Sequence, residues 1–262
     1  MRALEFDTDL MVQAGQCDVV DLPDRIIQTT PAEPNFWFGN RVLFRDPPRD
    51  AAQVIDGFHG DLPHARHICL GWDIPNLPLD HVRTVFAQTD LVVEQSETLA
   101  LRGQLNRASA PKGLTIRPLV SAADWAQSEA ISKRDLLADK MPVRGMDSFL
   151  SKRSKGRWAQ IEKRMGQWFG AFRGADLVGD MGIFHNDRLI RYQSVQTHFD
   201  HRRQGICSAL LCASLDWARA RAPDALAVIV ANAESDAGRL YRRAGFAALE
   251  TTISAFRPPD DG

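Results

Sequence analysis

Apolar side chains recur every three or four positions in two segments of the first hundred residues. These segments, residues 50–63 and 78–90, are therefore predicted to be helices. Asp50 is a suitable N-cap for the first helix, and Pro78 stands near the start of the second. Strands are predicted where β-branched and aromatic residues alternate with polar ones or cluster together. The predicted strands are residues 19–30, 35–48, 65–73 and 91–101.

The pattern stops at residues 102–113, which are polar, contain Gly, Ser, Ala and Pro, and show no periodicity. Such a composition is typical of a linker. We therefore expect an N-terminal domain at residues 1–101 and a second domain at residues 114–262.

The second part begins with a short predicted strand at residues 114–120. Ser121 and Asp124 form a capping-box-like start for a helix over residues 121–140. A second helix is predicted over residues 146–167, with a break near Gly156. Three strands follow between residues 168 and 199, and their turns are expected at Gly174-Ala175-Asp176 and Asn186-Asp187.

The last elements surround a helix predicted at about residues 203–220. Its apolar face is expected to be Ile206, Leu210, Ala213 and Trp217. Residues 226–232 are almost continuously apolar, as in a strand that is covered on both faces. A short helix at residues 235–245 and a strand at residues 246–256 complete the pattern.

The order of elements in the first part is strand, strand, helix, strand, helix, strand. The last half of the second part has the same order. We interpret this as a degenerate internal repeat, in which the first copy lacks the glycine-containing basic turn of the second.

The composition of the chain disfavours several classes of function. The 262 residues carry a net charge of −1, which disfavours nucleic acid as a partner. No apolar run approaches 18 residues, and the N-terminus shows no signal pattern, so we expect no membrane span and a cytoplasmic protein. The four cysteines form no C-x-x-C pair, and no metal site is predicted.

The segment with the clearest candidate chemistry is HRRQGICSALL, residues 201–211. The first turn of a helix has unpaired N–H groups and a partial positive charge. Gly205 lets a ligand approach the backbone, and arginines add charged donors. The segment is suited to a pyrophosphate, although the same residues also occur at the basic start of an ordinary surface helix.

The wider sequence resembles motif A of the Gcn5-related N-acetyltransferase (GNAT) family, whose pattern is Arg/Gln-x-x-Gly-x-Gly/Ala after a strand. Arg202 and Gly205 take the first and fourth positions, and Cys207 stands where the family has Gly or Ala. A second signature, SDAGRLYRRAGF, resembles the family's Ala-x-x-Leu-Tyr-x-x-x-Gly-Phe and includes Tyr241. Glu234 stands where an asparagine is frequent, and the nearest asparagine is Asn232.

The resemblance covers about residues 114–258 and implies an α/β fold. The expected architecture is a GNAT-like, mixed but mostly antiparallel twisted sheet flanked by helices, preceded by a smaller degenerate GNAT-like half. The segment TTPAEPNFWFGNRVLF in the first part is also similar to two-part bacterial members of the family.

The resemblance implies that acetyl-CoA is the cofactor and that its acetyl group passes directly to a primary amine. The backbone at Val195, Gln196 and Thr197 would hold the pantetheine, and an N–H near Thr197 would polarise the thioester carbonyl. The remaining residues expected at the cofactor are Arg202, Arg203, Gln204, Gly205, Ile206, Cys207, Ser208 and Asn232.

Tyr241 is the predicted general acid, because a phenol near the sulfur can protonate the departing thiolate. The alternative is that this tyrosine only packs its helix. The general base stays open, since Gln196 stands where many relatives have a glutamate and an amide cannot take a proton. His198, His185, Asp180 and a chain of waters are the candidates, and His198 is the one named with Tyr241 as catalytic.

The acceptor is expected to be a small-molecule or amino-acid-like amine. Residues 151–164 hold six basic residues and one acid, which could attract an acidic acceptor or nucleic acid, or form a solvated helix face. The competing function is a CoA-binding sensor or scaffold without turnover. Either a monomer or a homodimer is compatible with the sequence.

Overall fold

The computed structural model describes residues 1–34, 36–107, 111–138, 145–233 and 235–259. The first predicted helix forms as α2 (Ala51–Asp61), and the Asp50 carboxylate caps it by accepting the N–H of Gln53 at 2.9 Å. The second predicted helix forms as α3 (Leu79–Val85), directly after Pro78. Both starts agree with the sequence analysis because the signals at helix N-termini are local.

The chain forms two units that alternate along the sequence. Unit 1 comprises Met1–Leu99, Val230–Leu240 and Ala248–Gly262, and unit 2 comprises Ala100–Ile229 and Tyr241–Ala247. The first change of unit lies within two residues of the expected boundary at residue 101. The division into domains at 1–101 and 114–262, with a linker at 102–113, stays a prediction, and residues 108–110 of that linker lie outside the described residues.

The sheet of unit 1 has the strand order β1-β2-β3-β4-β11-β5. Strands β1, β2 and β3 pair antiparallel, β3 and β4 pair parallel, and β11 pairs antiparallel with β4. Helix α2 connects the parallel pair, as a crossover between parallel strands requires. The strands are β1 (Asp18–Asp21), β2 (Arg25–Thr29), β3 (Arg41–Phe44), β4 (Ile68–Trp72), β5 (Val92–Leu101) and β11 (Ala247–Arg257), with a 3₁₀ turn at Trp37–Gly39.

The core of unit 1 contains one helix that the sequence analysis did not predict. Helix α1 (Leu4–Val12) buries Phe6, which packs in a cluster with Ile26 and Leu43. It also buries the polar Thr8, whose hydroxyl donates to the carbonyl oxygen of Leu4 at 2.7 Å. Because polar residues share its buried face, the helix lacks a clear apolar stripe in the sequence.

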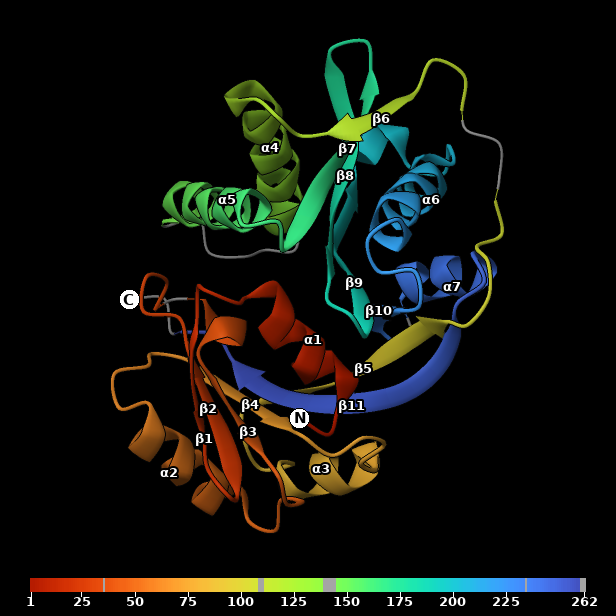
Figure 1. Cartoon of the computed structure of the whole chain (residues 1–262). Coiled ribbons are helices and arrows are strands. Elements are labelled where there is room, and N and C mark those ends of the chain that lie inside the picture. The colour runs from red at the N-terminus through yellow and green to blue at the C-terminus, as the bar shows by residue number, and fades with distance from the viewer. Residues whose placement is uncertain (35, 108–110, 139–144, 234, 260–262) are drawn as a thin grey trace. The chain divides into compact units, whose positions relative to one another are not determined.

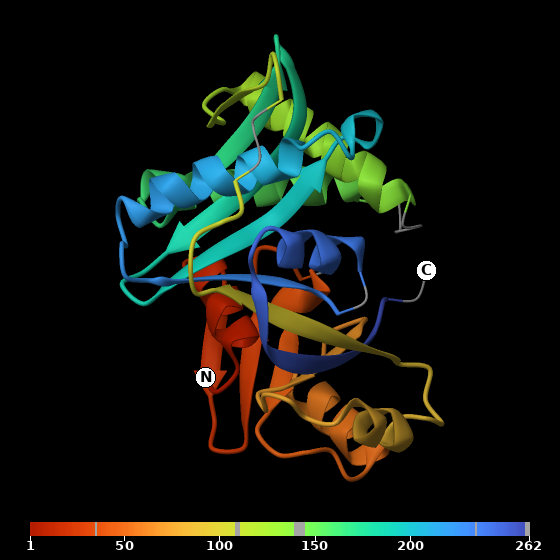
Figure 2. The same cartoon turned by 90° about the vertical axis from the view of Figure 1, so that its right-hand side faces the viewer.

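The sheet of unit 2 has the order β10-β9-β8-β7-β6 and is antiparallel except for the parallel pair β9–β10. Helices α4 and α5 cover one face of this sheet, and α6 covers the other (Figures 1 and 2). The expected mixed, mostly antiparallel architecture is thereby confirmed. The strands are β6 (Thr115–Pro118), β7 (Gly166–Arg173), β8 (Asp176–His185), β9 (Leu189–Thr197) and β10 (Leu226–Asn232), and the helices are α4 (Ala122–Ala138), α5 (Met146–Glu162), α6 (Ile206–Arg219) and α7 (Asp236–Arg243).

The capping box at the start of α4 forms as expected. The Ser121 hydroxyl accepts the N–H of Asp124 at 3.1 Å, and the Asp124 carboxylate accepts the N–H of Ser121 at 3.2 Å. A two-pronged ion pair with Arg117, at 2.8 Å to each carboxylate oxygen, holds the pKa of Asp124 well below its usual range. Residues 139 and 140 of the predicted helix lie outside the described residues.

Helix α5 differs from its prediction in two respects. It continues through Gly156 without a break, and it ends at Glu162 rather than residue 167. It stops because Arg164, two residues before the start of β7 at Gly166, adopts a left-handed conformation with φ of 59°.

Helix α6 buries a different face from the expected one. Its innermost side chains include Ile206 and Leu210 as predicted, followed by Ser214 and Ala218, whereas Trp217 is only partly buried. The buried Ser214 is tolerated because its hydroxyl donates to the Leu210 carbonyl oxygen at 2.7 Å. A hydroxyl that is satisfied inside its own helix gives no apolar signal in the sequence.

The two units share a supersecondary pattern. In unit 1 the antiparallel pair β2–β3 is followed by α2 and the parallel strand β4. In unit 2 the antiparallel pair β8–β9 is followed by α6 and the parallel strand β10. This correspondence supports the internal repeat. No helix among the described residues has both the length and the apolar character needed to cross a membrane.

Candidate active site

The basic turn lies between the end of β9 at Thr197 and the start of α6 at Ile206. A short 3₁₀ turn (η2, Phe199–His201) leads into it. Arg203 and Gly205 are both left-handed, with φ of 59° and 77°. These two residues prevent the helix from starting at residue 203, so α6 begins three residues later than predicted. When residues in the left-handed conformation alternate with residues in the right-handed or extended conformation, successive backbone N–H groups point into one concave site.

The N–H groups of Ile206, Cys207 and Ser208 have no hydrogen-bond acceptor among the described residues. They lie in the first turn of a 14-residue helix, where the helix dipole is positive. A Cβ at Gly205 would meet only Pro111, at an ordinary 3.5 Å. Glycine is therefore required by the φ angle of this residue rather than by lack of space.

The three side chains that precede Gly205 differ in what they can bind. Arg202 donates to the Thr197 carbonyl oxygen at 3.1 Å and lies 3.2 Å from both Asp135 carboxylate oxygens. Gln204 accepts a hydrogen bond from Arg173 at 2.8 Å. Both residues thus fix the turn from within the protein. The exposed Arg203 has no such partner among the described residues, so its guanidinium is free to meet a ligand.

Strand β9 is irregular beside this turn. Asp180 pairs with Gln196, but Gly182 pairs with Gln193, so Ser194 and Val195 face the single residue Met181. Ser194 has a φ of 49°, which identifies a β-bulge. Bulges re-aim backbone groups next to binding sites, and this one lies immediately before the predicted pantetheine segment Val195–Thr197.

Tyr241 lies on α7 and is 5% exposed. Its ring packs against Phe246 with centroids 6.4 Å apart, and its hydroxyl forms no hydrogen bond with a described residue. Burial raises the pKa of the Tyr241 phenol, with a smaller contribution from the nearby Cys207 thiol in the first turn of α6. The phenol is therefore neutral at physiological pH and lies near the start of the helix that follows the basic turn.

Cys207 is a packed residue rather than a reactive one. Burial raises the pKa of its thiol to about 12, so very little thiolate exists at neutral pH. Its side chain takes a position in the first turn of α6 where the resemblance expected Gly or Ala, and α6 keeps its helical geometry there.

Gln196 is held by a network from two other elements. Its Nε2 donates to Asp180 at 2.8 Å and to the Ser128 carbonyl oxygen at 3.3 Å. Its Oε1 accepts the Ser132 hydroxyl at 3.0 Å. The carboxylate must face the NH₂ group, so these contacts fix the orientation of the amide. Gln196 thus ties β9 to β8 and α4.

Asp180, one of the candidate bases, is completely buried behind Gln196. Trp168 Nε1 donates to its other oxygen at 2.8 Å. Burial raises the pKa of Asp180, while the hydrogen bonds from Trp168 and Gln196 and the charge of Arg157 act in the opposite direction. A carboxylate enclosed in this way serves as an acceptor for its neighbours and is not open to a substrate.

Both ring nitrogens of His198 face other groups. Nε2 lies 2.6 Å from Arg134 Nη1, and Nδ1 is 3.4 Å from the Asp200 N–H. Since a guanidinium can only donate, Nε2 must present its lone pair to Arg134. Burial and the charge of Arg134 lower the pKa of His198. This geometry gives no support to His198 as a proton acceptor, and its catalytic role stays a prediction.

His185 lies at the far end of β8. It pairs with Ile190, whereas Gly179 pairs with Thr197 beside the turn. Six residues of strand separate the two positions, roughly 20 Å at 3.3 Å per residue. The ring packs on Trp217 at 5.6 Å between centroids, and burial lowers its pKa.

Asn232 ends β10, where its carbonyl oxygen accepts the N–H of Ser235 at 3.1 Å and the Ser235 hydroxyl at 2.8 Å. Its contact with a cofactor stays a prediction. Glu234, which stands where relatives have an asparagine, lies outside the described residues.

Arg157 was not predicted as an individual site residue, although it lies in the basic segment at residues 151–164. The Arg157 guanidinium lies 4.1 Å from the ring centroid of Trp168 and donates to the Ser194 hydroxyl at 3.2 Å. No carboxylate among the described residues lies within 4 Å of it. Burial and the charge of Arg153 lower its pKa to about 9, which still leaves it charged at neutral pH. Arg157 is thus a cation without an acid partner, next to the bulge of β9.

Comparison with known proteins agrees with this geometry. Residues 164–248 match the family profile described as the acetyltransferase (GNAT) domain. This span contains the basic turn, the bulge and Tyr241. No curated protein matches the sequence.

Several solved structures share the fold. A conserved protein of unknown function from Staphylococcus epidermidis has a TM-score of 0.70 and 14% identity, over 92% of this chain and 93% of that one. A GCN5-related N-acetyltransferase from Kribbella flavida has a TM-score of 0.64 and 18% identity, over 98% and 96%.

A tandem GNAT protein from the clavulanic acid biosynthesis pathway is also similar, with a TM-score of 0.57 and 11% identity, over 95% of this chain and 85% of that one. At these identities the likeness shows the fold. Residues 164–248 thus form an acetyltransferase domain of the GNAT type.

Proposed function

We propose that this protein transfers an acetyl group from acetyl-CoA directly to the primary amine of a small, amino-acid-like acceptor. The observation that carries the proposal is the turn before α6. Among the described residues, the backbone N–H groups of Ile206, Cys207 and Ser208 have no acceptor, and Arg203 has no acid partner. Unpaired donors and an unpaired cation at a helix N-terminus fit the pyrophosphate of CoA.

Each group around the turn has a proposed task. The backbone N–H groups of Arg203–Ser208 hold the pyrophosphate, and Arg203 adds a charged contact. The backbone of Val195–Thr197, after the bulge, holds the pantetheine, and the N–H near Thr197 polarises the carbonyl. Acetyl-CoA supplies the activated acetyl group as a thioester.

Tyr241 is the proposed general acid. Its hydroxyl stays protonated because burial raises its pKa, so it has a proton to give to the departing thiolate. Its free hydroxyl fits this task better than a packing role alone, since a buried phenol normally finds a hydrogen-bond partner.

No side chain is assigned as general base. The Gln196 amide cannot take a proton, Asp180 is enclosed, and Nε2 of His198 is occupied by Arg134. The amine proton is therefore proposed to leave through water. This arrangement favours acceptors whose amine has a low pKa, because more of such an amine is neutral at physiological pH.

Arg157 supports an amino-acid-like acceptor over a simple amine. Its guanidinium lies over the Trp168 ring beside the bulge and has no acid partner among the described residues. A carboxylate on the acceptor would complete its charge pairing.

The competing function is a CoA-binding sensor, which the absence of a carboxylate at Gln196 favours. Calorimetry with CoA and thiol release from acetyl-CoA with a panel of amino acids and amines separate the two. The transferase is expected to bind CoA and to release thiol with at least one acceptor. CoA binding without turnover on any amine would support the sensor, and failure to bind CoA would contradict both functions.

A further inference from the structure

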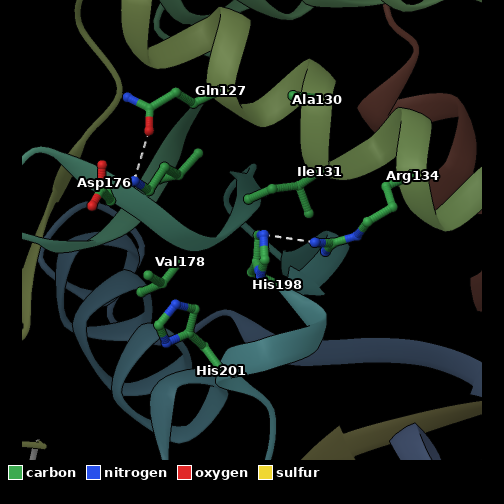
Figure 3. Close-up of a pocket in the computed structure, with 9 residues that line it drawn as sticks. Gln127, Ala130, Ile131, Arg134, Asp176, Val178, His198 and His201 are labelled. Carbon is green, nitrogen blue, oxygen red and sulfur yellow. Dashed lines mark hydrogen bonds between the residues drawn. The ribbon is translucent and has the colours of Figure 1, made fainter.

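A cavity of about 370 Å³ lies in unit 2. Helix α4, the beginning of β8 and the η2 turn enclose it (Figure 3). None of the residues 202–208 lines it. Its volume falls in the range of small-molecule sites. The lining residues are Gln127, Ala130, Ile131, Arg134, Asp176, Leu177, Val178, His198 and His201.

Two polar atoms of this lining are buried without a hydrogen-bond partner among the described residues. They are Nη2 of Arg134 and Nδ1 of His201. The nearest acid recorded for Arg134 is Asp135, at 3.8 Å, which is beyond hydrogen-bond distance. A buried polar atom without a hydrogen-bond partner costs free energy, so two in one cavity require an explanation.

Gln127 and His198 of the lining have hydrogen-bond partners within the protein. Gln127 accepts the N–H of Leu177 at 2.8 Å and donates to the Ala175 carbonyl oxygen at 3.3 Å. His198 accepts from Nη1 of Arg134 at 2.6 Å, which holds the guanidinium in place. Figure 3 shows Arg134 extending from α4 toward His198, with His201 on the η2 side. Among the described lining residues, Arg134 and His201 thus hold the buried polar side-chain atoms that lack a partner.

The charge and polarity of the lining select the ligand. Arg134 is a permanent cation, and Asp176, the one acid among the described lining residues, is exposed. Ile131 and Val178 are buried and supply an apolar wall. A carboxylate fits a guanidinium through two parallel hydrogen bonds, and a short hydrocarbon body would cover the apolar wall.

We propose that this cavity binds a small organic carboxylate, which accepts hydrogen bonds from Arg134 Nη2 and His201 Nδ1. In this complex His201 carries its proton on Nδ1. The site belongs to unit 2 alone and does not depend on the acetyltransferase function. It lies beside the η2 turn, so its occupant contacts the segment that leads directly into the phosphate-binding turn.

Binding to the full-length protein tests the proposal. Calorimetric titrations would use benzoate and butyrate, their neutral counterparts benzamide and butyramide, and inorganic phosphate. We expect benzoate to bind with a dissociation constant of about 1 mM or lower. Benzamide should bind at least about tenfold more weakly, because it cannot pair with the guanidinium charge.

Matched variants locate the site. Arg134→Gln should weaken benzoate binding at least tenfold. Lys133→Gln removes the same charge from the neighbouring position of α4, outside the cavity, and should change it less than twofold. Ala130→Trp keeps every charge but fills the exposed mouth of the cavity, and it should also abolish binding. His201→Phe removes the second donor and keeps the test informative if Arg134→Gln does not fold.

Four results would overturn the proposal. They are equal affinity for benzoate and benzamide, equal effects of Arg134→Gln and Lys133→Gln, phosphate binding in preference to both carboxylates, and no benzoate binding to the wild-type protein at 20-fold above the expected constant.

Discussion

Gly205 adopts a φ angle of 77° at a point where a side chain would have room, since its nearest neighbour would be Pro111 at 3.5 Å. Any side chain there carries backbone strain of about 1–2 kcal/mol. Substitutions at this position therefore combine a stability cost with an effect of the new side chain on the bound phosphate. Two different substitutions of Gly205 can separate the stability cost from the effect on phosphate binding.

Gly205→Glu and Gly205→Lys should lower the melting temperature by similar amounts, because both carry the same strain. Their effects on CoA affinity should differ, since only Glu places a negative charge beside the pyrophosphate. We expect Gly205→Glu to bind CoA at least about tenfold more weakly than Gly205→Lys, a difference of about 1.4 kcal/mol. Calorimetry measures both constants, and equal affinities would argue against a phosphate at this turn.

Tyr241→Phe should lower kcat about 100-fold and leave the KM for acetyl-CoA within about twofold, because it removes a proton donor used only in the transition state. The chain offers a matched control, since Tyr192 is its one other tyrosine. The Tyr192 hydroxyl donates to the Leu211 carbonyl oxygen at 3.1 Å, so Tyr192→Phe should cost about 1 kcal/mol of stability without loss of turnover.

The pH dependence gives a second readout for Tyr241. Burial raises its pKa above the ordinary value of about 10, so the phenol keeps its proton throughout the range from pH 6 to pH 10. The plot of kcat against pH should therefore show no descending limb below pH 10. A fall in kcat centred near pH 8, present in wild type and absent in Tyr241→Phe, would contradict this assignment.

At the scale of elements, β9 is joined to β8 and α4 through the Gln196 amide. Gln196→Glu would place a carboxylate against Asp180, at a contact that is now 2.8 Å long. Two carboxylates this close cannot both ionise in a buried site. We expect the variant to lose about 1–3 kcal/mol of stability at neutral pH.

The sign of its pH dependence follows from linkage. A carboxyl whose pKa is raised in the folded state destabilises the fold progressively as pH rises from the unfolded value, about 4, to the folded value. The melting temperature of Gln196→Glu should therefore lie closer to that of wild type at pH 5 than at pH 8. The double variant Asp180→Asn with Gln196→Glu restores one amide and one carboxylate, and it should recover most of the loss. If the double variant is less stable than Gln196→Glu, the network is not organised by this pair.

Whether an element can be predicted from the sequence depends on how far apart along the chain the residues that fix it lie. The start of α4, the start of α2 and the position of the basic turn were predictable because caps and turns are local. The network of Gln196 was not, since Ser132 is 64 residues away and Asp180 is 16 residues away. In the sequence, Gln196 is recognisable only as an amide at a position where many relatives have a glutamate base. In the structure, its hydrogen bonds join β9 to β8 and α4. Arg157 and Trp168 likewise meet only through packing of α5 on β7.

At the scale of the whole molecule, the central feature is the alternation of the two units along the chain. In unit 1, β11 lies between β4 and β5, although it follows them by well over a hundred residues. Its residues Ile253 and Ala255 are fully buried in the unit 1 core. Cutting the chain at the predicted linker, residues 102–113, would therefore remove β11 from unit 1.

A fragment of residues 1–113 should not fold, because it leaves β4 and β5 without the strand that lies between them. Its proton–nitrogen NMR spectrum should show the narrow dispersion of an unfolded chain. A synthetic peptide of residues 246–259 should restore dispersed signals, and the same peptide with Ile253→Asp should not. A fragment that folds without the peptide would show that residues 1–101 form an autonomous domain.

The position of β11 also has a consequence for biosynthesis. A ribosome adds about 5–20 residues each second, so β11 emerges roughly 7–30 s after β5. During that interval β4 and β5 expose strand edges that are meant for a segment not yet made. Unpaired edges of this kind recruit other chains. We therefore expect chaperones that shield such edges to assist the nascent protein, and slowing translation beyond residue 101 should increase its aggregation.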